Sequence, residues 1–251
     1  MDEQQLIDPN VINLFVEYCG IEPEETVLEI GPGAGNITEK LLEQARYLIC
    51  IEKNPKYLPI LGERFKNNDS LKIIQDDALK TYLPKHDRLV SNLPYKICEA
   101  FFQRTLRLSF KSATFIVPSG FAETLTTESN SIEYTKLSWL SHLFYTVKHL
   151  ETVSPSAYLP EPRVNTAIIS LKPKTDPGPV ERTLMELIQQ GDKYTKNALR
   201  ESLIRSQLAA SKKEARSIVD EMKLDDSVLE SWVSRLSLSD LEQIEKKLGS
   251  N

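Results

Sequence analysis

The chain contains 251 residues, carries a formal net charge of −5 at pH 7, and is 40% hydrophobic and 27% charged, which is ordinary for a globular protein. No apolar run approaches the roughly 20 residues of a membrane helix, the acidic first residues predict no signal peptide, and three widely spaced cysteines favour neither a disulfide framework nor a zinc site. We therefore expect a cytoplasmic protein without membrane or metal, and the acidic balance alone argues against nucleic-acid binding, because phosphates attract Lys and Arg.

Short apolar, β-branched runs alternate with amphipathic stretches over the first two thirds of the chain. Strands are predicted at residues 26–30, 47–52, 71–76, 88–92, 113–117, 143–153 and 164–171, and helices at 36–44 and 57–67. The last two strands lie close enough in sequence to pair as an antiparallel hairpin. This alternation indicates an α/β fold with a mostly parallel, seven-stranded, Rossmann-like sheet and helices on both faces.

A linker is predicted at residues 174–179, where Pro and Gly follow one another closely. After it the strand signals stop, and helices are predicted at residues 180–190, 195–208, 212–222, 227–234 and 240–248. Ser211 with Glu214, and Ser239 with Glu242, have the spacing of capping boxes. We expect two domains, an α/β domain over residues 1–174 and a small all-helical domain over residues 175–251.

A cluster of glycines, Gly31, Gly33 and Gly35, follows the first strand directly in a chain with only 9 glycines. A glycine turn between a strand and a helix predicts a nucleotide-binding corner, although it can also simply join the two elements. The dinucleotide pattern G-x-G-x-x-G fails because its third position is Asn36, and the P-loop ending is absent. With Glu29, the segment reads E-x-G-x-G-x-G, which is typical of S-adenosylmethionine (AdoMet) methyltransferases.

Carboxylates close the next two predicted strands, and the same strand ends would border a bound nucleoside. Glu52, followed by Lys53, can accept hydrogen bonds from both ribose hydroxyls. Asp77 can accept from the exocyclic amine of adenine. Its neighbour Asp76 is the alternative, and we favour Asp77 because Ala78 begins a turn that would pack beside the base. Each carboxylate alone could be a surface residue, but together with the glycines they predict an AdoMet site.

The fourth predicted strand runs into Asn92-Leu93-Pro94-Tyr95, which fits the [DNS]-[IL]-P-[YF] motif of methyltransferases that act on exocyclic amines of bases. The lone pair of adenine N6 is delocalised into the ring, so N6 is a poor nucleophile. The Asn92 side-chain oxygen and the Leu93 carbonyl can accept its two hydrogens and free the lone pair. Pro94 favours extended geometry at the residue before it, and Tyr95 offers a ring for a flipped base. Asn92 is also expected to border the cofactor.

The sequence resembles the ribosomal RNA adenine dimethyltransferases, the KsgA-type and Erm-type enzymes, over nearly its whole length. Three segments carry the resemblance: residues 6–12, the loop at residues 92–97, and residues 153–167, which match V-x-P-x-x-F-x-P-x-P-x-V-x-S-A. In the last segment the family's aromatic residue, implied to help hold the target adenine, falls on Tyr158; a buried loop aromatic is the alternative. The helical domain is similar to that of the small-subunit branch.

The resemblance implies AdoMet-dependent dimethylation of N6 at two neighbouring adenosines near the 3′ end of small-subunit rRNA, within an assembling ribosomal subunit, by a monomer. The chain departs from the family at its start, where Glu3 falls on the cofactor-holding glutamine and Gln5 on a phenylalanine. It departs again at residues 118–120, after the fifth strand. A non-catalytic relative that binds RNA or DNA as an assembly or transcription factor is therefore the alternative.

Basic residues concentrate in the predicted helical domain. Lys193, Lys196 and Arg200 recur at helical spacing, and we expect their shared face to contact rRNA phosphates, although such a face can also simply be solvated. The Debye length is about 8 Å at physiological salt, so local charge rather than net charge would govern this contact.

Overall fold

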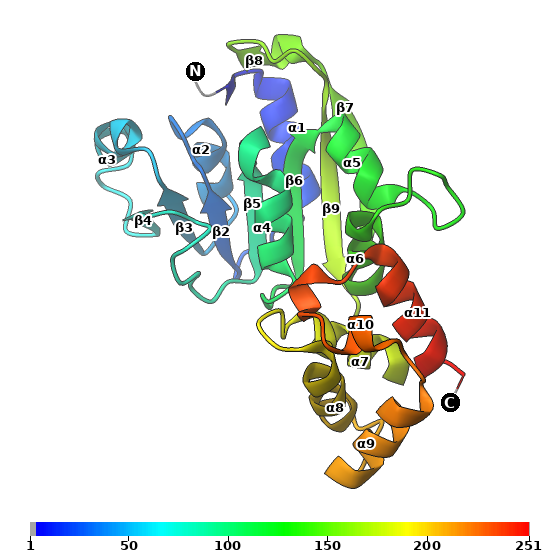
Figure 1. The fold of residues 1–251 in the computed structure, drawn as a ribbon. Helices are drawn as coiled ribbons and strands as arrows, with labels where there is room; N and C mark the ends of the chain where they lie inside the picture. Colours follow the sequence, from blue (N-terminus) through cyan, green and yellow to red (C-terminus); the bar gives the residue numbers. More distant parts are fainter. Residues whose placement is uncertain (1–3, 251) are drawn as a thin grey trace. The chain divides into compact units, whose positions relative to one another are not determined.

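The computed structural model describes residues 4–250, which form two compact units (Figure 1). The first unit extends to Thr126 and resumes over Tyr145–Pro173, and the second contains Thr127–Phe144 and the chain from Lys174 onward. Over residues 4–250, no helix is long and apolar enough to span a membrane. The acidic, His and Cys side chains of the same residues form no cluster suited to a metal ion.

A seven-stranded sheet with the order β4-β3-β2-β5-β6-β9-β7 forms the centre of the first unit (Figure 1). The pairs among β2 to β6 are parallel, and β9 pairs antiparallel with both β6 and β7. The strands are β2 (Thr26–Ile30), β3 (Tyr47–Glu52), β4 (Leu71–Gln75), β5 (Arg88–Asn92), β6 (Ser112–Pro118), β7 (Tyr145–Val153) and β9 (Thr166–Pro173). The predicted α/β fold with an antiparallel end is confirmed.

The strands were predictable because parallel strands are buried on both faces and therefore read as continuous apolar runs. In β2, Val27, Leu28 and Ile30 are all buried, and in β3 the same holds for residues 48–51. Glu29 is the exception, because its carboxyl group is buried in the middle of the apolar run of β2.

Helix α1 (Pro9–Cys19), which the sequence analysis did not predict, begins at a strong cap. The Asp8 side chain accepts from the main-chain N–H groups of Asn10 and Val11, and Pro9 occupies the first helical position. A short pair of strands, β1 (Gln5–Leu6) and β8 (Tyr158–Leu159), is antiparallel. The other helices of this unit are α2 (Asn36–Leu42), α3 (Leu58–Arg64), α4 (Cys98–Thr105) and α5 (Ser119–Thr126).

The second unit is helical, and it includes a segment that the expected division at residue 174 assigns to the first domain. Helix α6 (Lys136–Phe144) packs against α7 (Pro179–Ile188). It is also tied to the C-terminal part of the unit, because Trp139 Nε1 donates to Glu245 Oε2 at 2.8 Å and Lys136 Nζ donates to the Leu236 carbonyl at 2.7 Å. The remaining helices are α8 (Thr195–Arg205), α9 (Lys212–Glu221), α10 (Asp226–Leu229) and α11 (Leu238–Leu248).

Two expectations for this unit need correction. The helix predicted at residues 227–234 is two pieces, α10 and a 3-10 turn over Val233–Arg235. The capping box expected at Ser239 lies instead at Ser237 and Asp240, because α11 begins at Leu238. Ser211 does accept from the Glu214 N–H at the start of α9, although Glu214 itself reaches the Ala210 N–H.

A buried carboxylate, Glu25, connects the amino-terminal ends of three strands, β2, β5 and β6. Its side chain is 3% exposed, and it lies 2.6 Å from Arg88 Nε and 2.7 Å from Lys111 Nζ. Burial alone would raise the pKa of Glu25, but hydrogen bonds from Arg88, the Glu22 main chain and Lys111 lower it to about 2. Glu25 is therefore ionised in the folded chain at neutral pH.

We expect Glu25→Gln to lower the free energy of unfolding by roughly 1–3 kcal/mol at neutral pH, because Arg88 loses its charged partner. The folded pKa lies below the ordinary value, so the stabilisation is present above that value and is lost as the pH falls toward 2. Urea unfolding of the wild type and of Glu25→Gln over a range of pH measures the difference in free energy of unfolding. The difference between them should shrink on acidification, and a difference independent of pH would contradict the assignment.

Candidate active site

The residues proposed from the sequence follow the carboxyl ends of four neighbouring parallel strands. The strand order reverses between β2 and β5, and ligands of open α/β sheets bind in the crevice at such a point. The glycine loop follows β2, Glu52 ends β3, Asp77 follows β4 and Asn92 ends β5. Ser91 Oγ donates to the Ile30 carbonyl at 2.6 Å and so joins the end of β5 to the start of the glycine loop. The topology thus brings these residues to one edge of the sheet.

The glycine loop has a conformation that other residues adopt poorly. Gly31, Gly33 and Gly35 have φ values of 68°, 56° and 87°, the left-handed region that glycine tolerates without a steric penalty. A Cβ on Gly35 would lie 2.7 Å from the ring of Phe65, and one on Gly33 would collide with the side chain of Gln5. The tight turn predicted from the glycine cluster is therefore present.

Gln5 is a site residue whose role the sequence did not reveal. Its Oε1 accepts from the Ala34 N–H at 3.1 Å, and its Nε2 donates to the Tyr57 hydroxyl at 3.1 Å. The side chain thus holds the glycine loop from strand β1. The resemblance placed Gln5 where the family has phenylalanine, which was the only signal for this position; Glu3, placed at the family's glutamine, lies outside the described residues.

Glu52 is almost fully buried, and the main chain fixes its carboxylate. Oε2 accepts from the Gly33 N–H at 3.1 Å and Oε1 from the Asn54 N–H at 2.7 Å. The carboxylate is therefore oriented at the end of β3, beside the glycine loop.

The two aspartates after β4 have different surroundings. Asp77 is partly buried; its Oδ1 accepts from the Leu79 N–H at 2.9 Å, and its Oδ2 lies 3.0 Å from Lys53 Nζ. The hydrogen bond from Leu79 and the ammonium of Lys53 lower the pKa of Asp77. Asp76 is exposed, and its pKa is lowered by hydrogen bonds from Thr81 and from the main chain of Asp77. Ala78 is buried after them.

Glu29, the first residue of the glycine motif, turns its carboxyl group into the protein. It accepts from Thr38 Oγ1 at 2.7 Å and lies 3.3 Å from Cys50 Sγ, both of them buried. Burial raises the pKa of Glu29 to about 7, with Glu52 adding to the rise and the bonds from Thr38 and Cys50 opposing it. These contacts connect β2 to α2 and β3.

The loop after β5 presents polar atoms with no protein partner. The Asn92 side chain is partly exposed and, among residues 4–250, has no hydrogen-bond partner. The Tyr95 hydroxyl is buried and likewise lacks a partner within the described chain, and burial raises the pKa of Tyr95. Leu93 is buried and its N–H donates to the Ile116 carbonyl, whereas Pro94 is exposed.

Tyr158 lies in the core, at 3% exposure. Its main chain pairs with Leu6 of β1, and its hydroxyl lies 2.6 Å from Thr166 Oγ1. Burial raises the pKa of Tyr158, and the nearby Tyr95 adds to the rise. The hydroxyl that Tyr158 carries beyond the family's phenylalanine therefore has its own buried partner.

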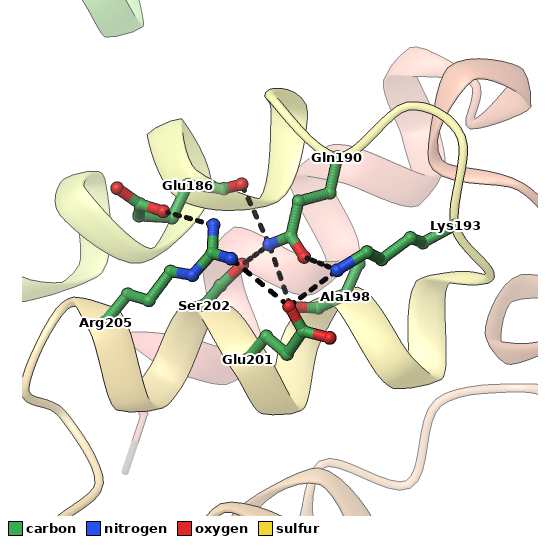
Figure 2. Close-up of polar contacts among 7 residues, drawn as sticks. All are labelled: Glu186, Gln190, Lys193, Ala198, Glu201, Ser202 and Arg205. Atoms are coloured by element: carbon green, nitrogen blue, oxygen red, sulfur yellow. Dashed lines mark hydrogen bonds and ion pairs between the residues drawn. The ribbon is translucent and has the colours of Figure 1, made fainter.

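The three cations proposed for RNA contact lie in the second unit, in different surroundings. Lys193 Nζ lies 2.6 Å from Glu201 Oε2 and 3.1 Å from Gln190 Oε1 (Figure 2). Arg200 has only a distant ion pair, with 3.9 Å between its NH2 and Asp220 Oδ1. Lys196 is partly exposed on α8, and no ion pair joins it to another described residue.

The family model for ribosomal RNA adenine dimethylase matches residues 2–239 of the chain. The chain belongs to this family. It is 32% identical to the probable ribosomal RNA small subunit methyltransferase A of Methanosphaera stadtmanae, over 99% of this chain and 92% of that protein. It is 35% identical to ribosomal RNA small subunit methyltransferase A of Clostridium botulinum, over 68% of this chain and 66% of the relative.

Two solved structures of methyl-transferring enzymes have the same fold. A dimethyladenosine transferase from Plasmodium falciparum has a TM-score of 0.65 at 23% identity, covering 97% of this chain and 98% of that chain. The 23S rRNA methyltransferase ErmE has a TM-score of 0.66 at 20% identity, covering 97% and 99%. The predicted methyltransferase fold of this family member is thus confirmed.

Proposed function

We propose that this member of the ribosomal RNA adenine dimethylase family transfers methyl groups from AdoMet to adenine N6 of small-subunit ribosomal RNA. The observation that carries the proposal is the unpartnered amide of Asn92 at the end of β5, beside the glycine loop and Glu52 at the neighbouring strand ends. The names of the relatives, ribosomal RNA small subunit methyltransferase A, support the same substrate. A non-catalytic role is not favoured, because both motifs are complete.

The strand-end residues fit the polar groups of AdoMet. Glu52 is oriented to accept from the ribose hydroxyls, and Asp77, held ionised by Leu79 and Lys53, to accept from the adenine amine, with Ala78 beside the base. Asp76 remains the alternative acceptor. Bound AdoMet supplies an electrophilic methyl group on a positively charged sulfur.

The glycine loop lets the backbone approach the cofactor closely through Gly31, Gly33 and Gly35. Two further side chains position this loop without needing to touch the cofactor. Gln5 holds the Ala34 N–H, and Glu29 connects the strand before the loop to the helix after it. We therefore assign Glu29 a positioning role in cofactor binding.

The loop after β5 would hold the target adenine. The Asn92 oxygen and the Leu93 carbonyl accept the two N6 hydrogens, which frees the nitrogen lone pair for attack, and no strong base is needed because the methylated amine loses its proton readily. Pro94 restricts the backbone that aims the Leu93 carbonyl. The base stacks on Tyr95, and Tyr158 supports this pocket from the core. Most of the rate enhancement would come from positioning and hydrogen bonding.

The resemblance to the small-subunit branch of the family supports a more specific choice of substrate. We propose two neighbouring adenosines near the 3′ end of small-subunit rRNA, modified in an assembling subunit in the cytoplasm by a monomer. The second unit would contact rRNA phosphates through Lys196 and Arg200, with Lys193 largely neutralised by Glu201. Methyl transfer from labelled AdoMet to under-methylated small subunits tests the proposal, with label expected in adenosine.

We expect Glu52→Gln to weaken AdoMet binding roughly 10- to 100-fold, because a neutral amide replaces the charged acceptor for two hydroxyls. Isothermal titration with AdoMet measures the effect, and Glu63→Gln, on the exposed surface of α3, serves as the matched control. Equal affinity of the two variants would remove Glu52 from the cofactor site.

A further inference from the structure

A cavity of about 550 Å³ lies in the second unit, in a segment of the fold that contributes nothing to the strand-end site. Its walls come from α8, the residues before α8, and the first turns of α9, and they include Tyr194, Ile204, Arg200, Lys212 and Arg216. The volume falls within the range of roughly 300–1,000 Å³ that small-molecule sites have in proteins. The cavity is therefore large enough for a nucleotide.

A group of charges that balance one another lies beside the cavity, and two of its members, Lys193 and Glu201, belong to the lining. Figure 2 shows Glu201 between Lys193 and Arg205, at 2.6 Å and 3.4 Å, and Arg205 also lies 3.3 Å from Glu186. The buried amide of Gln190 connects the two helices behind this group, since its Nε2 donates to Ser202 Oγ and to main-chain carbonyls of α7 and α8. Two cations and two carboxylates thus compensate one another.

Three other cations in the lining carry positive charge with little compensation. Lys212 and Arg216 on α9 have no ion-pair partner within residues 4–250. Arg200 meets Asp220 only at 3.9 Å, and its Nε has no hydrogen-bond partner in the described chain. Three cations therefore face the cavity against one further carboxylate, that of Asp192. Such an arrangement suits a phosphate group.

An exposed tyrosine lines the same cavity, and an exposed tryptophan outside the lining packs against it. Tyr194 lines it at 44% exposure, and Trp232, at 37% exposure, lies with its ring centroid 5.0 Å from that of Tyr194. The main chains of the two residues also pair as an antiparallel bridge, which holds their backbones side by side. Aromatic side chains beside a positively charged groove are the usual stacking surface for unpaired bases.

We propose that this cavity binds one unpaired nucleotide of RNA, with its phosphate on Arg200, Lys212 and Arg216 and its base against Tyr194 and Trp232. This inference rests on the proposed function for its class of ligand. An unpaired nucleotide fits better than a duplex, because the bases of an A-form helix are stacked inside and not available to an aromatic ring. The cavity would then anchor single-stranded rRNA independently of the adenine that is methylated.

The test uses a short single-stranded oligouridylate and the full chain, since uracil has no exocyclic amine to methylate. Removing one phosphate contact reduces the slope of log affinity against log salt by about 0.7 for a single strand. We expect at least this reduction in the double variant Lys212→Ala/Arg216→Ala. Lys213→Ala, which removes the adjacent lysine outside the cavity lining, is the matched control and should change the slope less.

Stacking is tested at the aromatic pair. Tyr194→Ala should weaken oligouridylate binding roughly 5- to 150-fold, whereas Tyr194→Phe, which keeps the ring, should bind like the wild type. Oligouridylate should also quench tryptophan fluorescence in the wild type but not in Trp232→Phe, whose remaining tryptophan, Trp139, is buried. The quenching readout remains informative even where Tyr194→Ala folds poorly.

Equal slopes for the double variant and Lys213→Ala, or unchanged quenching in Trp232→Phe, would overturn the inference. Methyl transfer by the wild type is measured separately. A chain that methylates rRNA but shows no cavity-dependent oligouridylate binding overturns this inference alone, and a chain that binds oligouridylate through the cavity but transfers no methyl group overturns the proposed function alone.

Discussion

Asn92→Ala should lower kcat for methyl transfer by on the order of 10²- to 10³-fold, the usual cost of losing one preorganised hydrogen-bonding group at a reacting centre. The Asn92 oxygen is proposed to accept a hydrogen of adenine N6, and no described residue competes for it. Without this acceptor the N6 lone pair stays delocalised. AdoMet affinity should change little, because Glu52 and Asp77 hold the nucleoside. Single-turnover transfer and isothermal titration measure the two quantities.

A conservative variant at the same position distinguishes the loss of the acceptor oxygen from a defect in folding. Asn92→Asp keeps an acceptor oxygen and should retain far more activity than Asn92→Ala, since the motif admits Asp at this position. Asn68→Ala, an exposed asparagine after α3, controls for loss of an amide elsewhere. Full activity of Asn92→Ala would show that the proposed activation of N6 is wrong.

Glu29→Gln should make the chain more stable than the wild type at alkaline pH. Burial raises the pKa of Glu29 from 4.5 to about 7, so the folded state binds the proton more tightly than the unfolded state. The associated stabilisation is complete below pH 4.5 and is lost as the pH rises through about 7. The shift corresponds to about 3 kcal/mol.

Glutamine resembles the protonated carboxyl group, can still accept from Thr38, and does not titrate. Urea unfolding below and above the range of the shift therefore measures the effect. At low pH the two proteins should have similar free energies of unfolding, and above about pH 7 the variant should be the more stable by up to about 3 kcal/mol. A variant that is less stable than the wild type above that pH would contradict the raised pKa of the buried Glu29 carboxyl group.

The sheet and the edge that carries the site could be predicted because local sequence determines both. Continuous apolar runs mark parallel strands, and residues such as Glu52 and Asn92 follow those strands directly, so the order of elements brings them together. Helix α1 could also have been found, since Asp8-Pro9 is a strong helix start. The family resemblance then supplied the chemistry that spacing alone left open.

The remaining features depend on contacts between distant residues. Glu29 lies in a sequence motif typical of a cofactor site, yet its contacts with Thr38 and Cys50 hold its carboxyl group inside the protein. Lys193 has the context of an RNA contact, yet Glu201 balances its charge. Residues 127–144 carry no linker signal, and only packing such as Trp139 on Glu245 places them in the second unit.

Nucleoside analysis by mass spectrometry tests the central claim most directly. The purified chain is incubated with AdoMet and small ribosomal subunits that lack adenine dimethylation, with large subunits as the parallel substrate. We expect N6,N6-dimethyladenosine in the small-subunit rRNA of the wild-type reaction and its near absence with Asn92→Ala. AdoMet binding without methylated adenosine, or methylation confined to large-subunit rRNA, would contradict the account.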